Sequence, residues 1–210
     1  LILHDLRNPL PILKGQIQLM GIYAEEPERL RGHIKASLSE VERLERLANE
    51  FLDYSRGEIR LDMAIAKPSA LLEKTRERVA ARLERNKVEA LIEVDWDEPI
   101  IVDGERLLRA LQNVADNACK AMASRGGELT MRAFREGPSL IFEIADTGEG
   151  MTDEVLARVF DPFYSASGQG GSGLGMLIVK NIMEAHGGSV RLASESDKGT
   201  HVYLALPIRA

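Results

Sequence analysis

Five glycines lie within the eight residues from Gly168 to Gly175, which read GQGGSGLG. Such a density suits neither a strand nor a helix interior, because every glycine adds to the backbone entropy that folding must overcome. Bare N–H groups can instead come close to an anion, and the apolar run from Leu174 to Met183 predicts a helix whose N-terminus points to the same place. By itself, this stretch is as typical of a flexible surface loop as of a phosphate-binding loop.

A second group combines amide and ammonium side chains. Asn113, Asn117 and Lys120 are spaced by four and three residues, which places them on one face of the helix expected from Arg106 to Met122. Two amides and an ammonium beside an apolar stripe offer a metal ligand and a charge partner for phosphate. The alternative is a solvated helix face, which would more typically carry glutamate and lysine.

A third group follows the strand expected from Leu140 to Ala145. Asp146 opens the sequence D-T-G-E-G, where a carboxylate can accept a hydrogen bond from an exocyclic amine. Gly148 and Gly150 would let a flat ring lie against the backbone, although D-T-G-E-G is also a turn signature. The residues from Phe160 to Tyr164 include three of the nine Phe and Tyr side chains. Such a group is typical of the anchored hinge of a mobile lid and also of a small core cluster.

A fourth group lies close to the start of the chain, in HDLRNP. His4 and Asn8 are one helical turn apart on the same face, and Asp5 is close enough to orient the imidazole. Pro9 removes a helical hydrogen bond and should bend the helix just beyond the histidine. A solvated polar stripe with a tolerated kink is the alternative to a reactive histidine.

These groups require elements to position them, and the first is a pair of helices. Apolar spacings of three and four predict one helix through Met20, a break from Gly21 to Glu26, and a second helix from Pro27 to about Tyr54. An antiparallel hairpin cannot bury both apolar seams alone, so we expect a homodimer that completes a four-helix bundle. The first seam consists of Leu3, Leu6, Leu10, Leu13, Ile17 and Met20.

Beyond a boundary expected from Gly57 to about Pro68, the pattern changes to mixed helices and strands. The predicted fold class is α+β: a helical hairpin followed by an α/β sandwich with one helical layer on a mixed sheet. Expected helices are Ser69 (as N-cap) to about Arg85, Arg106 to Met122, Thr152 towards Val159, and Leu174 to Met183. Expected strands are Val88 to Val94, Ile100 to Val102, Leu129 to Phe134, Leu140 to Ala145, Ser189 to Ala193 and Thr200 to Leu206.

Composition limits the function classes. The 210 residues are 44% hydrophobic and 29% charged, which is ordinary for a soluble protein, and the net charge of −6 argues against broad binding to nucleic acid. The single Cys119 excludes an internal disulfide, and we expect neither a membrane-spanning run nor a signal peptide. Because Leu1 lies inside an expected helix and is not methionine, we expect a fragment of a longer protein.

In the order HDLRNP, N-x-x-x-N-A-x-K, D-x-G-x-G, F-D-P-F, G-S-G-L-G and a closing G-T, the motifs resemble the catalytic core of bacterial sensor histidine kinases. They run from His4 to Thr200 and therefore span nearly the whole chain. The resemblance implies a dimerisation and histidine-phosphotransfer hairpin over residues 1–57, a hinge over 58–68 and a Bergerat-type ATP-binding domain over 69–210.

The resemblance also implies roles for single residues. His4 would accept the phosphoryl group, and Asp5 would polarise the imidazole of His4. Asn8 would position water when the same domain dephosphorylates its partner. Asn117 would hold Mg²⁺, with Asn113 and Lys120 near the phosphates of ATP. The remaining expected nucleotide contacts are Asp146 on the adenine amino group with Thr200 in support, Gly148 and Gly150 beside the ring, and Gly171, Ser172, Gly173, Leu174 and Gly175 at the closing end of an ATP lid that starts near Thr147.

Two positions refine the resemblance. ATPases of the gyrase and chaperone type have a glutamate as general base where this chain has Asn113, and an amide cannot take a proton. Many family members have an arginine just after the aromatic pair, whereas Ser165 follows Tyr164 in this chain. The first difference favours transfer of the γ-phosphoryl group to an external nucleophile, and the second leaves the charge partner of that group unassigned.

We therefore predict the core of a two-component sensor histidine kinase. It would autophosphorylate His4 with ATP and Mg²⁺ and pass the phosphoryl group to an aspartate of a response-regulator receiver domain. It could also act as the phosphatase of that response regulator. A GHKL-type ATPase and a nucleotide-gated scaffold without phosphotransfer are the alternatives. We expect a cytoplasmic homodimer that binds no nucleic acid and meets a membrane only through segments upstream of Leu1, if at all.

Overall fold

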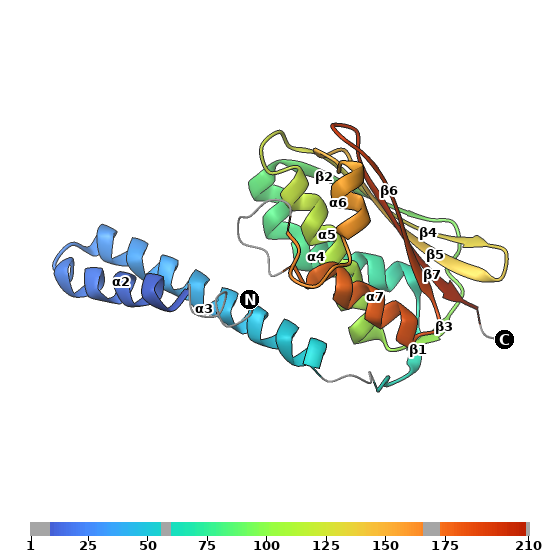
Figure 1. Cartoon of the computed structure of the whole chain (residues 1–210), viewed down its shortest axis with the longest axis horizontal. Helices are drawn as coiled ribbons and strands as arrows, with labels where there is room; N and C mark the ends of the chain where they lie inside the picture. The colour runs from blue at the N-terminus through green and yellow to red at the C-terminus, as the bar shows by residue number, and fades with distance from the viewer. Residues whose placement is uncertain (1–8, 56–59, 166–172, 209–210) are drawn as a thin grey trace.

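The computed structural model describes residues 9–55, 60–165 and 173–208. Helices α2 (Pro9–Ile22) and α3 (Pro27–Ser55) lie side by side as an antiparallel hairpin that projects from the rest of the chain (Figure 1). As predicted, Pro27 opens the second helix, where its missing N–H is not needed. Near the connection, the ring of Tyr23 stacks on His33, whose Nδ1 lies 2.7 Å from Gln16 Oε1.

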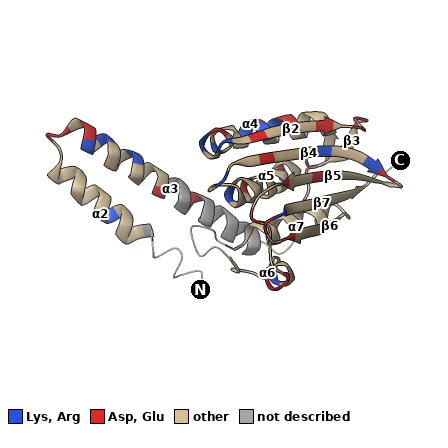
Figure 2. Cartoon of the chain, turned by 90° about the horizontal axis from the view of Figure 1, so that it is seen from above, with Lys and Arg blue, Asp and Glu red and all other residues tan. Residues whose placement is uncertain are grey.

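A five-stranded mixed sheet forms the larger part of the molecule, in the order β2-β4-β5-β7-β6 (Figure 2). Only the β2–β4 pair is parallel, and the other three pairs are antiparallel. Helices α4 (Pro68–Asn86), α5 (Gly104–Ala121) and α7 (Gly175–Ala185) form a single layer on one face of the sheet (Figure 1). The strands are β2 (Val88–Val94), β4 (Gly127–Glu136), β5 (Ser139–Asp146), β6 (Ser189–Glu195) and β7 (Gly199–Pro207).

This architecture confirms the predicted α+β class with a helical hairpin and an α/β sandwich. The core lies between the sheet and the three helices. Phe142 and Ile144 of the central strand β5 meet the apolar stripe of α5 there, and four positions of that stripe are all buried. Those positions are Leu107, Leu111, Val114 and Ala118.

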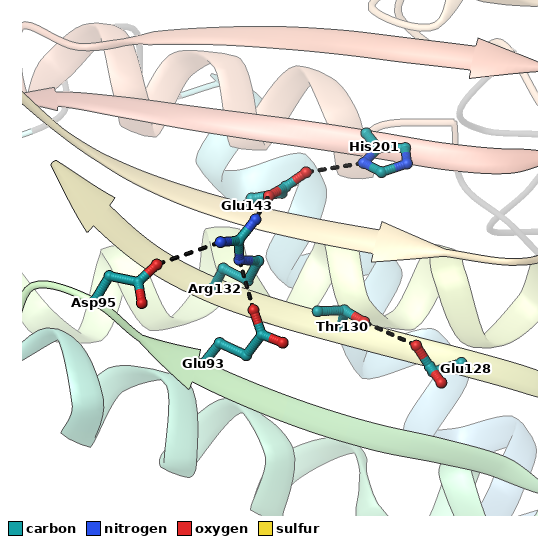
Figure 3. A network of polar contacts seen from close by, with 7 residues as sticks. All are labelled: Glu93, Asp95, Glu128, Thr130, Arg132, Glu143 and His201. Carbon is teal, nitrogen blue, oxygen red and sulfur yellow. Dashed lines mark hydrogen bonds and ion pairs between the residues drawn. The ribbon is translucent and has the colours of Figure 1, made fainter. Parts of the chain in front are cut away.

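The other face of the sheet carries charged side chains that pair with one another (Figure 3). Arg132 lies 2.8 Å from a carboxylate oxygen of Glu93 and 3.5 Å from Glu143, whose other oxygen is 2.9 Å from His201 Nδ1. These ion pairs cover part of the outer face of the central strands, while Leu140, Phe142 and Ile144 of β5 belong to the core under the helical layer.

The structure corrects the prediction at the start of α4. The N-cap residue is Lys67 and not Ser69, because Pro68 fits the first helical position without an N–H of its own. The backbone N–H of Ser69 donates instead to Asp97 Oδ1 at 2.8 Å, a bond that lowers the pKa of the Asp97 carboxyl. A partner 28 residues away therefore replaces the local cap.

The segment expected to be a linker also contains a short strand. Strand β1 (Ala64–Ala66) pairs antiparallel with β3 (Ile100–Val102) as a separate two-stranded sheet. Ala64 and Ile65 are exposed and Ala66 is half-buried, so the three residues give no amphipathic pattern and the strand depends on its partner. The domain boundaries at residues 57 and 68 remain a prediction. In the part of the chain that the structure describes, no helix is both long and apolar enough to cross a bilayer.

Candidate functional site

Asp146 lies at the end of the central strand β5, at the edge of the helical layer. It is 7% exposed, and the backbone N–H of Gly148 donates to its Oδ1 at 2.9 Å. Burial raises the pKa of its carboxyl above the ordinary value, and hydrogen bonds from the N–H groups of Gly148 and Thr200 offset part of that rise. A buried carboxylate with spare acceptor positions is suited to an amino group of a bound ring.

Thr200 lies directly opposite Asp146 in the β5–β7 register, and its hydroxyl is oriented by a residue that the sequence analysis missed. The hydroxyl of Ser194 donates to the carbonyl of Gly199 at 2.9 Å and lies 2.8 Å from Thr200 Oγ1. Because Ser194 has one hydroxyl proton, Thr200 must donate to Ser194, which leaves the lone pairs of Thr200 Oγ1 free to accept.

Ser194 also accepts a hydrogen bond from the N–H of Met151 at 2.9 Å. It thereby joins the segment after D-T-G-E-G to the β6–β7 hairpin. A serine in a strand carries no motif. The only signal in the sequence is its position six residues before Thr200 across a predicted hairpin.

The glycines of D-T-G-E-G are required by the protein's own packing. A Cβ atom on Gly148 would lie 2.7 Å from the Cβ of Ala121 at the end of α5. Gly150 has a φ of +63°, and its Cβ would lie 2.0 Å from the carbonyl oxygen of Glu195. These contacts fix the turn next to Asp146, and contact of either glycine with a bound ring remains a prediction.

The helix α5 brings its predicted amide face to the start of α7. Asn113 Nδ2 donates to the carbonyl of Gly175 at 3.4 Å, while Asn117 and Lys120 are exposed further along the same face. Asp116 is directed elsewhere, because its carboxylate lies 2.6 Å from Arg82 Nη1 on α4. The face therefore presents amides and an ammonium, as the spacing predicted.

The N-terminus of α7 is suited to an anion. No side chain in the described part of the chain caps it, and no atom lies within 4 Å of where a Cβ on Gly175 would be. The first N–H groups of a helix carry a partial positive charge and bind phosphate well. The amide face of α5 and the start of α7 thus form two sides of one candidate site.

The aromatic run closes the base of the glycine-rich loop. Phe163, at a φ of +64°, donates its backbone N–H to the carbonyl of Gly173 at 3.0 Å. Phe160 and Phe163 also pack against the core, so the features of a core cluster and of an anchored loop base are both present. Arg158 lies 4.0 Å from the centre of the Tyr164 ring and 3.3 Å from Asp161.

Several predicted site residues lie outside the described ranges, namely His4, Asp5, Asn8, Gly171 and Ser172. Among the residues that are described, no group of three His, Cys, Asp or Glu side chains could hold a metal ion.

Two family models match this chain. Residues 102–210 match the family described as histidine kinase-, DNA gyrase B- and HSP90-like ATPase. Residues 2–59 match the His Kinase A (phospho-acceptor) domain.

Among curated proteins, the chain is 28% identical over 207 residues to sporulation kinase B of Bacillus subtilis, covering 97% of the chain and 47% of that protein. It is 32% identical over 208 residues to the sensor protein DivL of Caulobacter vibrioides, covering 97% of the chain and 27% of that protein. It is 30% identical over 213 residues to the sensor protein SrrB of Staphylococcus aureus, covering 97% and 36%. The chain thus spans less than half the length of these relatives.

Among solved structures, the histidine kinase AdeS of Acinetobacter baumannii is similar with a TM-score of 0.79 at 24% identity, covering 99% of this chain and 98% of AdeS. Full-length ShkA in complex with AMPPNP has a TM-score of 0.76 at 27% identity, covering 87% and 39%. Histidine kinase ThkA in complex with the response regulator TrrA has a TM-score of 0.79 at 22% identity, covering 99% and 60%. AdeS and ThkA bear on the fold alone.

Proposed function

This chain belongs to the histidine kinase family, with a phosphoacceptor domain and an ATP-binding domain, and on that premise we propose that it transfers the γ-phosphoryl group of ATP to its own His4. The observation that carries the proposal is the polar face of α5. Asn113 contacts the start of α7, whereas Asp116, the nearest carboxylate in sequence, pairs with Arg82 on the opposite side. Among the described residues of α5, Asp116 is held by Arg82 and an amide cannot deprotonate water, so this face favours another nucleophile over hydrolysis.

In the proposed reaction, the neutral imidazole of His4 attacks the γ-phosphorus in line through Nε2. The bond from phosphorus to the bridging oxygen breaks, and ADP leaves with that electron pair. Asp5 accepts a hydrogen bond from Nδ1–H and stabilises the positive charge that develops on the ring. The loose transition state mainly requires positioning and charge neutralisation, which Lys120 and the first N–H groups of α7 supply.

Mg²⁺ fits this donor set. It prefers oxygen ligands, keeps several waters and binds through phosphate oxygens, so one exposed amide oxygen from Asn117 is a suitable protein ligand. When bound, the ion would neutralise charge on the phosphates. Between Thr147 and Gly175 the sequence has a single Lys or Arg, Arg158, and this residue is engaged with Asp161 and Tyr164.

The test of the proposal is labelling with γ-labelled ATP. We expect His4→Gln to abolish acid-labile, base-stable label while nucleotide binding is kept. His33→Gln is the matched control, because His33 is the other histidine of the hairpin and is engaged with Gln16 and Tyr23. Label that persists in His4→Gln and disappears in His33→Gln would overturn the assignment of the phosphoacceptor.

We further propose that an aspartate of a response-regulator receiver domain takes the phosphoryl group from His4, and that Asn8 positions water when the chain dephosphorylates that regulator. The match of residues 2–59 to the His Kinase A (phospho-acceptor) domain supports a partner of this class. ThkA, which is titled as a complex with a response regulator, is an example of the same fold with such a partner. Because ATP is the substrate, we place this part of the protein in the cytoplasm.

We also propose that the hairpin dimerises. Apolar side chains on both helices are exposed in the single chain, at fractions of 38% to 71%. Two copies that complete a four-helix bundle would bury them, which favours association. The side chains are Leu10, Ile12, Ile17, Ile22, Ile34, Leu38 and Val41.

A further inference from the structure

His186 is a buried histidine between two helices of the nucleotide site. It follows the last residue of α7 and is 3% exposed. Its Nδ1 lies 2.7 Å from the carbonyl oxygen of Ile182, one turn earlier in the same helix. The backbone N–H of Asp103, the N-cap residue of α5, donates to its Nε2 at 3.0 Å.

These partners assign the state of the ring. A carbonyl oxygen can only accept, so Nδ1 must carry a proton, and a backbone N–H can only donate, so Nε2 must be unprotonated. Only the neutral imidazole with its proton on Nδ1 satisfies both contacts. The ring therefore bonds the C-terminal turn of α7 to the N-cap residue of α5.

The partner of this bond is held firmly. The Asp103 carboxylate accepts from the N–H of Arg106 at 3.0 Å and from the N–H of Asp62 at 3.0 Å. Asp103 is 6% exposed, and it follows strand β3, which pairs with β1. Movement of α7 along α5 would have to break the His186 bond, because Asp103 cannot follow.

The two helices are antiparallel neighbours with a second polar contact at the other end of α7, next to the middle of α5. There, Asn113 of α5 donates to the carbonyl of Gly175 at the start of α7. That end is where the candidate phosphate site lies. Between Gly175 and His186 the helix is a rigid rod of 11 residues, so its position at the histidine end fixes its position at the phosphate end.

We propose that His186 is a positioning residue of the nucleotide site. Its Nε2 accepts the N–H of Asp103 and thereby fixes the position of α7 along α5. That position sets the spacing between the Asn113–Asn117 face and the first N–H groups of α7. The inference rests on the proposed nucleotide site. A shift of α7 along α5 would misplace every phosphate contact made by the first N–H groups of α7. Loss of the hydrogen bond from His186 to the carbonyl of Ile182 would only weaken the C-terminal turn of α7.

Two amide variants separate the contacts. The Gln side chain in His186→Gln can place an acceptor where Nε2 lies, and so keeps the bond to Asp103. The shorter side chain in His186→Asn can place a donor where Nδ1 lies, and so keeps only the bond to Ile182. Binding of a non-hydrolysable ATP analogue to the 210-residue chain is measured by calorimetry, with thermal unfolding without nucleotide as the measure of the fold.

We expect His186→Asn to weaken binding about tenfold and His186→Gln to remain within about threefold of the parent chain. Thr75→Val is the matched control, because Thr75 is also fully buried and donates to a carbonyl, Leu71 O, within one helix and away from α7. It should lower thermal stability and leave binding unchanged.

Equal affinities for the Asn and Gln variants would overturn the inference. A ¹⁵N NMR spectrum of the unaltered chain that shows the His186 proton on Nε2 would also overturn the inference. This measurement does not depend on the folding of any variant. If the unaltered chain binds no analogue, it is the proposed function that fails.

Discussion

Arg82 Nη1 lies 2.6 Å from Asp116 Oδ1, in an ion pair that joins α4 to α5 and is largely shielded from solvent. Asp116 precedes Asn117 in the sequence, yet the pair directs its carboxylate away from the amide face. Hydrolases of the related ATPase families need a carboxylate on that face. The ion pair with Arg82 therefore makes Asp116 a structural residue whose carboxylate does not face the candidate site.

Asp116→Asn should leave autophosphorylation of His4 intact and lower the free energy of unfolding. We expect a loss of about 1–3 kcal/mol, because Arg82 loses its charged partner in a partly buried position. Chemical denaturation measures the loss, and labelling with γ-labelled ATP measures the activity. If labelling disappears while nucleotide binding persists, Asp116 has a catalytic role that its pairing argues against.

Release of ADP by the parent chain should stall after about one equivalent per site, because the phosphoryl group remains on the protein and little inorganic phosphate is formed. Continuous turnover in the absence of a response regulator would favour an ATPase instead.

Asp146→Asn should weaken ATP binding and, at neutral pH, stabilise the protein without nucleotide. Burial raises the pKa of the Asp146 carboxyl above its ordinary value near 3.8, so the folded chain holds this proton to higher pH than the unfolded chain. The contribution of this group to stability is therefore present at low pH and is lost as pH rises through the raised pKa. A neutral amide avoids that loss.

Thermal unfolding of both chains from pH 3 to pH 8 tests the sign. The gain from Asp146→Asn should shrink towards zero as the pH falls below about 4, where the aspartate is protonated in both states. A variant that is less stable than the parent at pH 7 would contradict the dominance of burial over the two hydrogen bonds. Unchanged ATP affinity would contradict the adenine contact.

Gly173 and Gly175 should respond in opposite ways to alanine. A Cβ on Gly173 would lie 2.4 Å from the backbone carbon of Phe163 at a φ of +68°, whereas among the described residues no further side chain or loop atom lies within 4 Å of one on Gly175. We therefore expect Gly173→Ala to lower stability by about 1–3 kcal/mol. Gly175→Ala should be neutral or slightly stabilising in the helix and weaken ATP binding, because the methyl group enters the space next to the first N–H groups of α7.

Thermal unfolding and calorimetry on the two variants provide the comparison. Equal ATP affinity for Gly175→Ala and the parent chain would place the phosphates elsewhere.

The sequence allowed most elements to be predicted because their patterns are local. The stripe on α5, the strand Val88–Val94 and the hairpin turn before Thr200 each follow from a short period or a turn signature. The prediction of Ser69 as the N-cap, by contrast, was wrong, because the backbone N–H of Ser69 donates to Asp97, which lies 28 residues away in the sequence. Strand β1 was missed because three residues have no period of their own.

The same distinction applies to the candidate site. Asn113, Asp146 and Thr200 belong to motifs and were found. Ser194 and His186 act through hydrogen bonds to partners that folding brings close, and a sequence does not state such distances. The roles of His4, Asp5 and Asn8 remain predictions, because these residues lie outside the described ranges.

Asn117→Ala should weaken nucleotide binding only when Mg²⁺ is present. The amide of Asn117 is exposed on the face of α5 and would provide one of the few protein ligands of the ion. We expect affinity in Mg²⁺ to fall about tenfold, to that of the parent chain in a chelator. Gln112→Ala, one residue before Asn113 on the same helix, is the control that should leave the Mg²⁺ dependence unchanged. An equal loss with and without Mg²⁺ would assign Asn117 to the nucleotide and not to the metal.

Leu38→Asp should convert the proposed dimer to monomers. Leu38 is 59% exposed on α3 in the single chain, and each dimer would bury two copies of it in the bundle. Loss of two buried leucines at about 1.5–3 kcal/mol each raises the dissociation constant more than a hundredfold, before the cost of the buried charge is counted. Ile65→Asp is the control, because Ile65 is 77% exposed on β1, outside the hairpin, and should leave the mass unchanged. Sedimentation at micromolar concentration measures both. A parent chain that sediments as a monomer would mean that the exposed hairpin seam is buried in some other way.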